Sequence, residues 1–321
     1  MTDSRYLKGH ISMLLATIMW GALAPIAKIV LEHDVVSGLG LSVIRIGGGA
    51  LLFLLISFLP RSLTGDCKVE KKDYLTLFLA SIIMISLNQG LYIIGIGYTS
   101  PVDTTVMCTL TPVFTLLLAA IFIGQPLTVI KVGGIIIGLS GALIMAFSNE
   151  ESEIASNPLL GNTLCILAQI CAAIYYVFFL KIITRYPPFT IMKWMFLFSA
   201  VTYIPCMIPF MGGIAVERID YPALLSLLYI IIFPTFFAYL LIPVAQKILK
   251  PTVISSYAYL QPVVATTLAT IIGLAIFGWN RIIATAMIFL GVYLVSFSMR
   301  KKPNPKKSDK EFFDPTMESQ V

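Results

Sequence analysis

Charged residues are scarce in this sequence. Only 12% of the 321 residues are Asp, Glu, Lys or Arg, whereas 58% are hydrophobic and the mean hydropathy is +0.92. Long stretches contain no Asp, Glu, Lys or Arg, among them 74–102, 104–130, 132–149, 154–180, 194–216, 221–246, 251–280 and 282–299. One soluble core cannot hide this much apolar surface, and a helix needs roughly 20 apolar residues to cross a bilayer. The composition therefore excludes a soluble domain and predicts an all-α integral membrane protein.

Patterns that carry catalysis are missing as well. The sequence has no HExxH motif and no pair of carboxylates in an apolar stretch, and its two histidines, His10 and His33, lie at the ends of the first predicted helix. No GxxxxGK loop is present for ATP. The five cysteines form no CxxC pair, which favours buried free thiols. We therefore predict no catalytic residues, no metal and no cofactor, and an energy source other than ATP.

An internal repeat is present. The segment PVDTTVMCTLTPVFT at 101–115 shares its proline, leucine and Pro-Val positions with PTVISSYAYLQPVVA at 251–265, at a constant offset of 150 residues. A period of this length in an apolar chain indicates two folded halves rather than a solenoid of short units.

Ten transmembrane helices are predicted, five on each side of an acidic stretch at 148–158. Their ranges are 11–31, 37–59, 74–98, 102–123, 127–147, 159–183, 189–210, 221–246, 252–277 and 282–299. The first is expected to be a retained helix rather than a signal peptide, because its apolar segment is too long for a signal core. An odd number of helices per half inverts the second half. The expected domains are 1–147 and 159–302, an external linker at 148–158 and a disordered cytoplasmic tail at 303–321.

Basic residues agree with this arrangement. With the amino terminus in the cytoplasm, 17 of the 22 Lys and Arg residues lie in inside segments and three lie outside. The other two, Arg45 and Lys193, lie within predicted spans, and we expect Lys193 to extend to the cytoplasmic surface as an anchor. A bias of this size is typical of a correct topology. Both termini are therefore predicted to be cytoplasmic, and the net charge of +6 requires no nucleic-acid partner.

Several short motifs resemble a known family. Trp20-Gly21 lies in the first helix, Ile44-Arg45-Ile46 in the second, and LTPVFT and LQPVVA in the fourth and ninth. Together with ten helices in inverted halves, they resemble the EamA-type family of the drug/metabolite transporter superfamily. The chain departs from that family after the fourth helix, where Gly124-Gln125 replaces the usual Gly-Glu.

The resemblance implies a secondary transporter in the plasma membrane, which is the inner membrane of a bacterium. Its implied substrates are amino acids, related metabolites or amphipathic drugs, most often exported by alternating access. A GxxxG motif at Gly134 and Gly138 allows a close helix contact, which the resemblance places against the other half or against a second copy in a homodimer. The alternatives are a membrane-embedded enzyme, or a passive channel or scaffold, for which charge rings or a filter motif are expected.

The predicted substrate site lies between the halves. Pro112 and Pro262 each free a helix carbonyl, of Cys108 and Ala258, which only protein or trapped water can satisfy in a membrane. Polar and aromatic side chains of neighbouring helices fall near the same depth: Trp20, Asn88, Gln89, Tyr92, Thr111, Gln169, Tyr176, Tyr257 and Gln261. The alternative for the polar residues is helix bracing, and for the aromatic residues packing or an interface belt.

Two charged residues lie near this site. Arg45 is deep enough for a substrate carboxylate or a protein partner, with snorkelling as the alternative, and Asp103 is the only carboxylate near the predicted cavity. No proton relay is visible in the sequence. The expected cavity is thus polar and nearly neutral, which suits zwitterionic or amphipathic molecules.

The charge bias yields a test of topology. A single cysteine replacing Glu151 should react with a membrane-impermeant maleimide from outside, whereas Cys67 and a cysteine replacing Lys306 should react only after the membrane is permeabilised. Labelling at position 151 from the cytoplasmic side alone would contradict the five-plus-five arrangement.

Overall fold

The structure, a computed structural model, describes residues 2–32, 34–99, 104, 107–147, 157–271 and 279–300. This part of the chain consists of helices and connecting loops and contains no β-strand. Six helical stretches in it are long and apolar enough to cross a membrane: Ser4–Leu31, Gly38–Ser57, Lys71–Tyr98, Pro158–Phe178, Pro188–Phe210 and Tyr221–Gln246. Three shorter apolar helices accompany them: Thr111–Phe122, Val129–Ile144 and Ile282–Ser298. The prediction of an all-helical, multi-pass membrane protein is confirmed.

The described residues of the first part of the chain form five groups of helices. They are α1 (Thr2–Gly21) with α2 (Leu23–Glu32); α3 (Gly38–Ser57) with the short α4 (Arg61–Thr64); η1 (Lys71–Asp73) with α5 (Tyr74–Ser81), η2 (Ile82–Gln89) and α6 (Gly90–Tyr98); α8 (Thr111–Phe122); and α9 (Val129–Phe147). Pro25 separates α1 from α2 because it has no N–H for the carbonyl of Gly21. Ser37 caps α3 by accepting a hydrogen bond from the Gly40 amide at 3.0 Å.

The second part begins after the predicted linker, most of which lies outside the described residues. It contains α10 (Pro158–Phe178) with α11 (Leu180–Arg185); α12 (Pro188–Met207) with η3 (Ile208–Phe210); η4 (Val216–Arg218); α13 (Tyr221–Ile231) with η5 (Ile232–Phe237) and α14 (Ala238–Gln246); α15 (Pro251–Ser256) with η6 (Tyr257–Tyr259) and α16 (Leu260–Ile271); and α17 (Trp279–Arg300). The sixth helix was predicted to continue to residue 183, but α10 ends at Phe178. Asn157 and Asp220 cap α10 and α13.

Two of these segments are π-helices rather than α-helices. They are η2, which begins at Ile82, and η5, which begins at Ile232. Their starting positions differ by 150 residues, which is the offset of the sequence repeat. π-Turns within helices frequently mark functional sites, and here they occur at matching places in the two parts of the chain.

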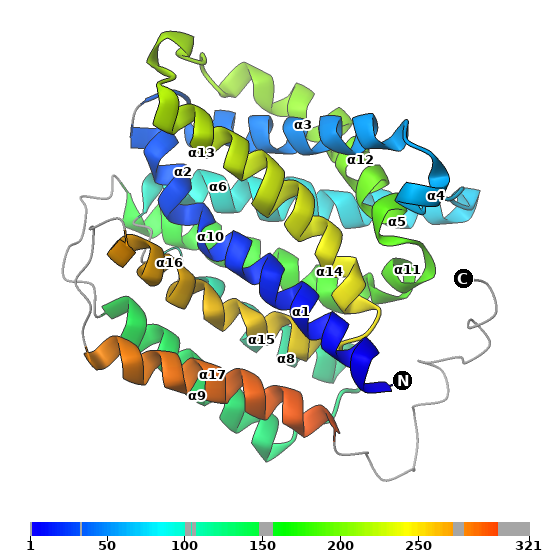
Figure 1. Ribbon diagram of the computed structural model, residues 1–321, viewed down its shortest axis with the longest axis vertical. Coiled ribbons are helices and arrows are strands. Elements are labelled where there is room, and N and C mark those ends of the chain that lie inside the picture. Colours follow the sequence, from blue (N-terminus) through cyan, green and yellow to red (C-terminus); the bar gives the residue numbers. More distant parts are fainter. Residues whose placement is uncertain are drawn as a thin grey trace.

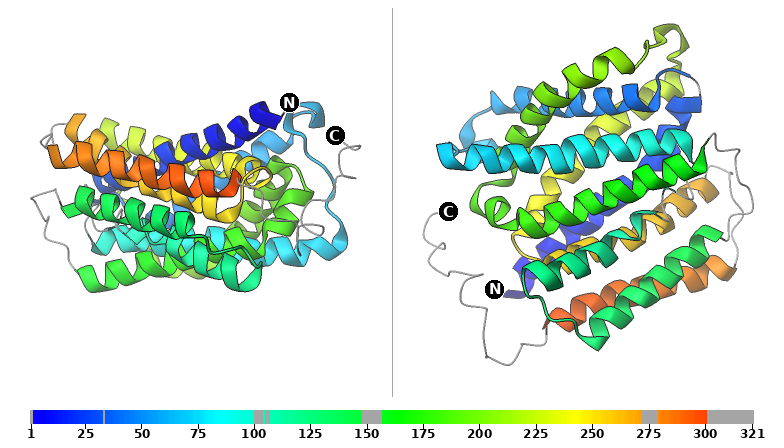
Figure 2. Two further views of the ribbon diagram at one scale, coloured as in Figure 1. Left: turned by 90° about the horizontal axis from the view of Figure 1, so that it is seen from below. Right: turned by 180° about the vertical axis from the view of Figure 1, so that it is seen from behind.

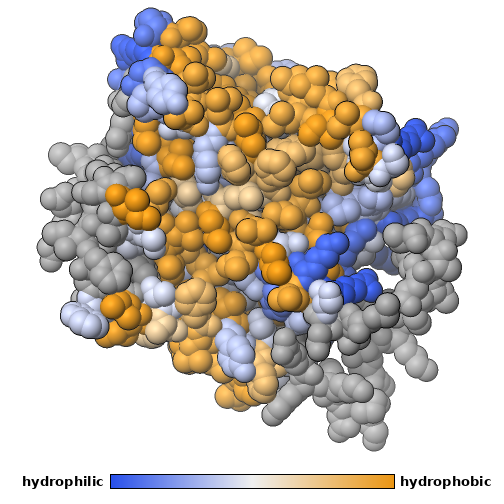
Figure 3. All heavy atoms as spheres, in the orientation of Figure 1, coloured by the Kyte–Doolittle hydropathy of each residue, from blue (hydrophilic) through white to orange (hydrophobic). Residues whose placement is uncertain are grey.

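The helices lie side by side, from α3 and α12 at one end of the molecule to α9 and α17 at the other (Figure 1). Figure 2 shows the same order from behind. The face in Figure 3 is largely covered by hydrophobic side chains, and hydrophilic residues gather toward its left and right edges. Large apolar side chains such as Leu51, Leu117 and Ile136 are exposed, as expected for a surface that faces lipid.

A polar cluster joins the loop before α5 to α12. Lys193 forms an ion pair with Asp66, and the Thr190 hydroxyl donates to the same carboxylate at 2.9 Å. The side chain of Lys193 is only 12% exposed and that of Asp66 14%. The lysine expected to extend to the cytoplasmic surface thus ends at a carboxylate of the loop before α5, and its role as a surface anchor stays a prediction. Its partner lies 127 residues away in the sequence, and local pattern could not reveal it.

A second set of contacts extends this cluster. Arg185 pairs with Asp73 at 2.8 Å and also with Glu70, and the Tyr186 hydroxyl donates to Asp73 at 2.7 Å. The hydrogen bond with Lys72 is the main factor that lowers the pKa of Glu70, which keeps this carboxylate charged. These contacts fix the loop of the first part of the chain against the second part.

Glycines let α9 approach α17 closely. A Cβ atom on Gly134 would lie 3.0 Å from the carbonyl oxygen of Gly291, and one on Gly138 would lie 2.7 Å from the ring of Tyr259. The Tyr259 hydroxyl in turn donates to the carbonyl of Ile135 at 3.1 Å. The GxxxG motif therefore packs against helices of the same chain.

This packing predicts that Gly138→Leu destabilises the protein. The added side chain would overlap Tyr259, and overpacking of this kind typically costs about 1–3 kcal/mol. Its thermal midpoint in detergent should fall below that of the wild type. Gly133→Leu is the matched control, because nothing lies within 4 Å of a Cβ atom at that glycine. Equal midpoints for the two variants would show that the close approach at Gly138 contributes nothing.

Candidate binding cavity between the two parts of the chain

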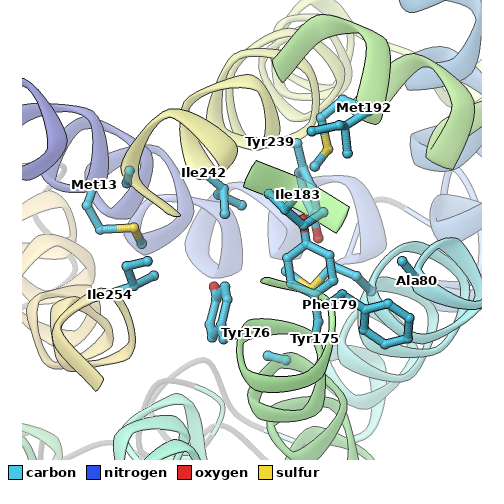
Figure 4. Packing of buried hydrophobic residues seen from close by; sticks show 14 of the residues in the cluster. Met13, Ala80, Tyr175, Tyr176, Phe179, Ile183, Met192, Tyr239, Ile242 and Ile254 are labelled. Carbon is cyan, nitrogen blue, oxygen red and sulfur yellow. The ribbon is translucent and has the colours of Figure 1, made fainter. Parts of the chain in front are cut away.

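A cavity of about 60 Å³ lies where helices from both parts of the chain meet. It has room for a few water molecules, so a larger ligand requires it to widen. Its lining combines polar, aromatic and aliphatic side chains: Met13, Trp20, Leu23, Arg45, Met84, Asn88, Gln89, Tyr92, Cys108, Thr111, Gln169, Ala172, Tyr176, Tyr239, Ile254, Ser255, Ala258 and Gln261. In Figure 4, Met13 and Ile254 lie close together, while Tyr176 and Tyr239 project from other helices.

One wall is organised around the π-helix η5. Because Pro234 has no N–H, the carbonyl of Ile230 needs another donor, and the Thr235 hydroxyl supplies it at 2.7 Å. Arg45 Nε donates to the oxygen of that hydroxyl at 2.7 Å, and Arg45 Nη2 donates to the carbonyl of Pro234 at 3.2 Å. Trp20 Nε1 donates to the same carbonyl at 2.9 Å. Helices α1 and α3 are thus both anchored to η5.

Another wall comes from the other π-helix, η2. Asn88 Nδ2 donates to the carbonyl of Ala168 in α10 at 2.7 Å, and the Tyr239 hydroxyl approaches Asn88 Oδ1 at 3.5 Å. Gln89 is 1% exposed, and neither polar atom of its side chain makes a hydrogen bond of good geometry, although Tyr239 lies nearby. A buried amide whose hydrogen bonds are incomplete is unusual, since nearly all buried polar groups are satisfied.

A third contact lies beside Pro112. The Thr111 hydroxyl lies 2.8 Å from Gln169 Oε1 and 2.8 Å from the carbonyl of Cys108, which Pro112 cannot serve. A single hydroxyl proton is shared between these two acceptors. In the later repeat, the 3₁₀ turn η6 precedes Pro262 in α16. In each case the helix is interrupted just before the proline.

The structure brings together most of the residues that the sequence singled out. Eight of the nine predicted binding residues line the cavity, namely Trp20, Asn88, Gln89, Tyr92, Thr111, Gln169, Tyr176 and Gln261, and Arg45 joins them. Tyr257 does not. It lines a second hollow formed with α1 and α17, where its hydroxyl lies 2.6 Å from His10 Nδ1. Asp103 lies outside the described residues.

Sequence reasoning missed the partner of Arg45. Pro234 followed by Thr235 inside an apolar span was the available signal, because this pair frees a carbonyl and offers a hydroxyl to satisfy it. The aliphatic wall of Met13, Leu23 and Met84 was missed as well. Residues of these types also face lipid, so the sequence does not distinguish the two positions. Only the packing shows that these three line the cavity. In the described part of the chain, no cluster of three or more His, Cys, Asp or Glu residues could hold a metal ion.

Relatives named as transporters match this sequence over nearly its whole length. An uncharacterized transporter of Archaeoglobus fulgidus is 24% identical over 294 residues, which are 90% of this chain and 99% of the relative. An uncharacterized transporter of Clostridium kluyveri is 24% identical over 311 residues, 94% of this chain and 96% of the relative. A solved crystal structure aligns with a TM-score of 0.71 and 18% identity over 94% of this chain and 100% of that one, which supports the fold alone.

The family model gives the most specific match. The model of the EamA-like transporter family matches residues 7–147 and again residues 159–297. These two matches cover most of the chain and agree with the resemblance of the Pro-Val motifs. The chain therefore belongs to the EamA-like transporter family and is a multi-pass membrane protein.

Proposed function

We propose that this protein is a secondary transporter that moves a small metabolite, amino acid or amphipathic drug out of the cell. Its substrate binds in the cavity between the two parts of the chain, and rocking of these parts exposes the cavity to each side of the membrane in turn. The family and the transporter relatives support membrane transport in general. The substrate class, the export direction and alternating access are our own inference.

The observation that carries this proposal is the set of hydrogen bonds around the cavity. Trp20 to Pro234, Arg45 to Thr235, Asn88 to Ala168 and Thr111 to Gln169 each join residues of the first part to residues of the second. A net contribution of about 0.5–1.5 kcal/mol is typical of one neutral hydrogen bond, and about 1.5–3 kcal/mol of one made by a charged group such as that of Arg45. A few bonds of this strength hold the cavity closed without preventing a substrate from shifting the balance.

We also propose ten transmembrane helices in two inverted repeats, 1–147 and 159–302, with both termini in the cytoplasm. The 150-residue offset of the π-helices and the double match of the family model support this arrangement. The start of α1 and the end of α17 line one hollow, through Tyr6 and Phe297 among others. An even number of crossings puts both ends on the same side. The basic residues favour the cytoplasm, and the plasma membrane is the proposed location.

Cavity variants test this site. Gln261→Ala and Asn88→Ala each remove one neutral hydrogen-bonding group from the lining. A loss of about 0.5–1.5 kcal/mol raises the half-saturating substrate concentration about two- to tenfold. Transport kinetics are to be measured after the variants are shown to reach the membrane in equal amounts.

Tyr257→Phe is the control for these variants. Tyr257 has a polar hydroxyl on an aromatic ring, as several cavity residues do, but it lines the other hollow. It should leave the half-saturating concentration unchanged. If Gln261→Ala and Asn88→Ala both behave like Tyr257→Phe, the substrate binds elsewhere.

Export itself is tested by a metabolite-resolved assay. Intracellular and extracellular metabolites are compared between cells that lack the protein and cells that over-produce it. The proposal predicts at least one small metabolite that accumulates inside the former and outside the latter. If no metabolite changes in either compartment, or if the only change is net uptake, export is not its function.

A further inference from the structure

The cavity contains a buried positive charge whose hydrogen-bond partners among the described residues are uncharged. Arg45 is 2% exposed, and it donates to the Thr235 hydroxyl and to the carbonyl of Pro234. No Asp or Glu is among the residues that line the cavity, and within the described part of the chain no carboxylate forms an ion pair with Arg45. A guanidinium group stays protonated in proteins. A buried charge is costly unless a partner neutralises it.

The guanidinium group also has donors left for a ligand. It carries five N–H donors in a planar fork, and the contacts to η5 use one on Nε and one on Nη2. The Nη1 group and the second Nη2 hydrogen therefore remain. Arg is well suited to a carboxylate because two parallel N–H donors match its two oxygens.

Gln89 is a second, independent observation in the same cavity. Its side chain is almost fully buried, it lines the cavity, and both its polar atoms lack a well-formed hydrogen bond. It also belongs to η2, the counterpart of η5, and η5 contains the two residues to which Arg45 donates. An amide without a well-formed hydrogen bond and a cation with no anionic partner among the described residues, both in the lining of one cavity, define a place for a polar ligand group.

We propose that this cavity binds a ligand with a single carboxylate, which pairs with the free N–H groups of Arg45 while Gln89 hydrogen-bonds to the polar end of the same ligand. This inference rests on the proposed function and names the substrate class for it. The lining offers one cation, so one negative charge is neutralised. A phosphate ester or a dicarboxylate would bring in a second charge that no residue of the lining matches.

The rest of the lining defines the remainder of the ligand. Met13, Leu23, Met84 and Ile254 offer an apolar surface for a short hydrocarbon group. Trp20 and Tyr239, whose rings pack edge to face with centroids 5.5 Å apart, add aromatic surface that suits an aliphatic chain or an ammonium group. The carboxylate is thus carried by either a simple apolar acid or an apolar amino acid, and these two sources are separated in the test.

Matched acids and amides test the proposal on the purified, full-length protein in detergent. The probes are 4-methylpentanoate, leucine, 4-methylpentanamide and leucinamide, and the readout is the concentration of each that gives half of the maximal shift in thermal midpoint. At least one acid should bind about tenfold more tightly than its own amide, because the amide lacks the charge that Arg45 pairs with. A preference for 4-methylpentanoate over leucine identifies a simple acid, and the reverse identifies an amino acid.

Substitutions of Arg45 assign the preference to this residue. R45Q should reduce acid binding to the level of the amide, and R45K, which keeps the charge without the planar fork, should retain part of the preference. Tyr257→Phe should bind the acids as the wild type does. Because the acid and the amide are compared first on the wild-type protein, a variant that fails to fold does not decide the result.

Equal shifts with acids and amides, or no shift with either, would overturn the carboxylate assignment. So would a wild-type preference that survives in a folded R45Q protein. The transporter proposal is judged separately by the export assay. Export of uncharged compounds alone would leave that proposal standing while removing this one.

Discussion

A backbone carbonyl without an amide partner is costly in a hydrocarbon environment, and this constraint determines where the cavity forms. Prolines in the middle of predicted spans free such carbonyls, and at Pro234 and Pro112 a side chain supplies the missing donor. Thr235 serves the carbonyl of Ile230, and Thr111 serves that of Cys108. Since these hydroxyls also contact Arg45 and Gln169, the repair of the backbone brings helices from both parts of the chain to one place.

The same constraint explains why the cavity is polar but almost uncharged. A donor that serves a neutral carbonyl need not carry a charge, so amides, hydroxyls and an indole are sufficient for most of the lining. Arg45 is the exception. Two of its N–H groups donate to η5. The side chain also lines the cavity, where none of the described lining residues is a carboxylate. Anchoring of the helix and recognition of a ligand can therefore reside in one side chain.

Much of this arrangement could be predicted from the sequence, because the 150-residue repeat and the prolines place the polar residues at one depth. Trp20, Asn88, Gln169 and Gln261 do meet around one cavity. Tyr257 does not, because it begins the 3₁₀ turn η6, whose tighter winding rotates side chains away from the positions that an α-helix gives them. The pairing of Lys193 with Asp66 could not be predicted either, because it depends on the packing of a distant loop against α12.

Counterflow in proteoliposomes tests the central claim, that the cavity is exposed to one side of the membrane at a time. Purified protein is reconstituted into vesicles loaded with an excess of an unlabelled metabolite identified by the export assay, and a trace of the labelled metabolite is added outside without ATP. An alternating-access carrier predicts transient accumulation of label above its equilibrium level, because returning carriers exchange one molecule for another. Simple equilibration without this overshoot would indicate a channel and would contradict the account.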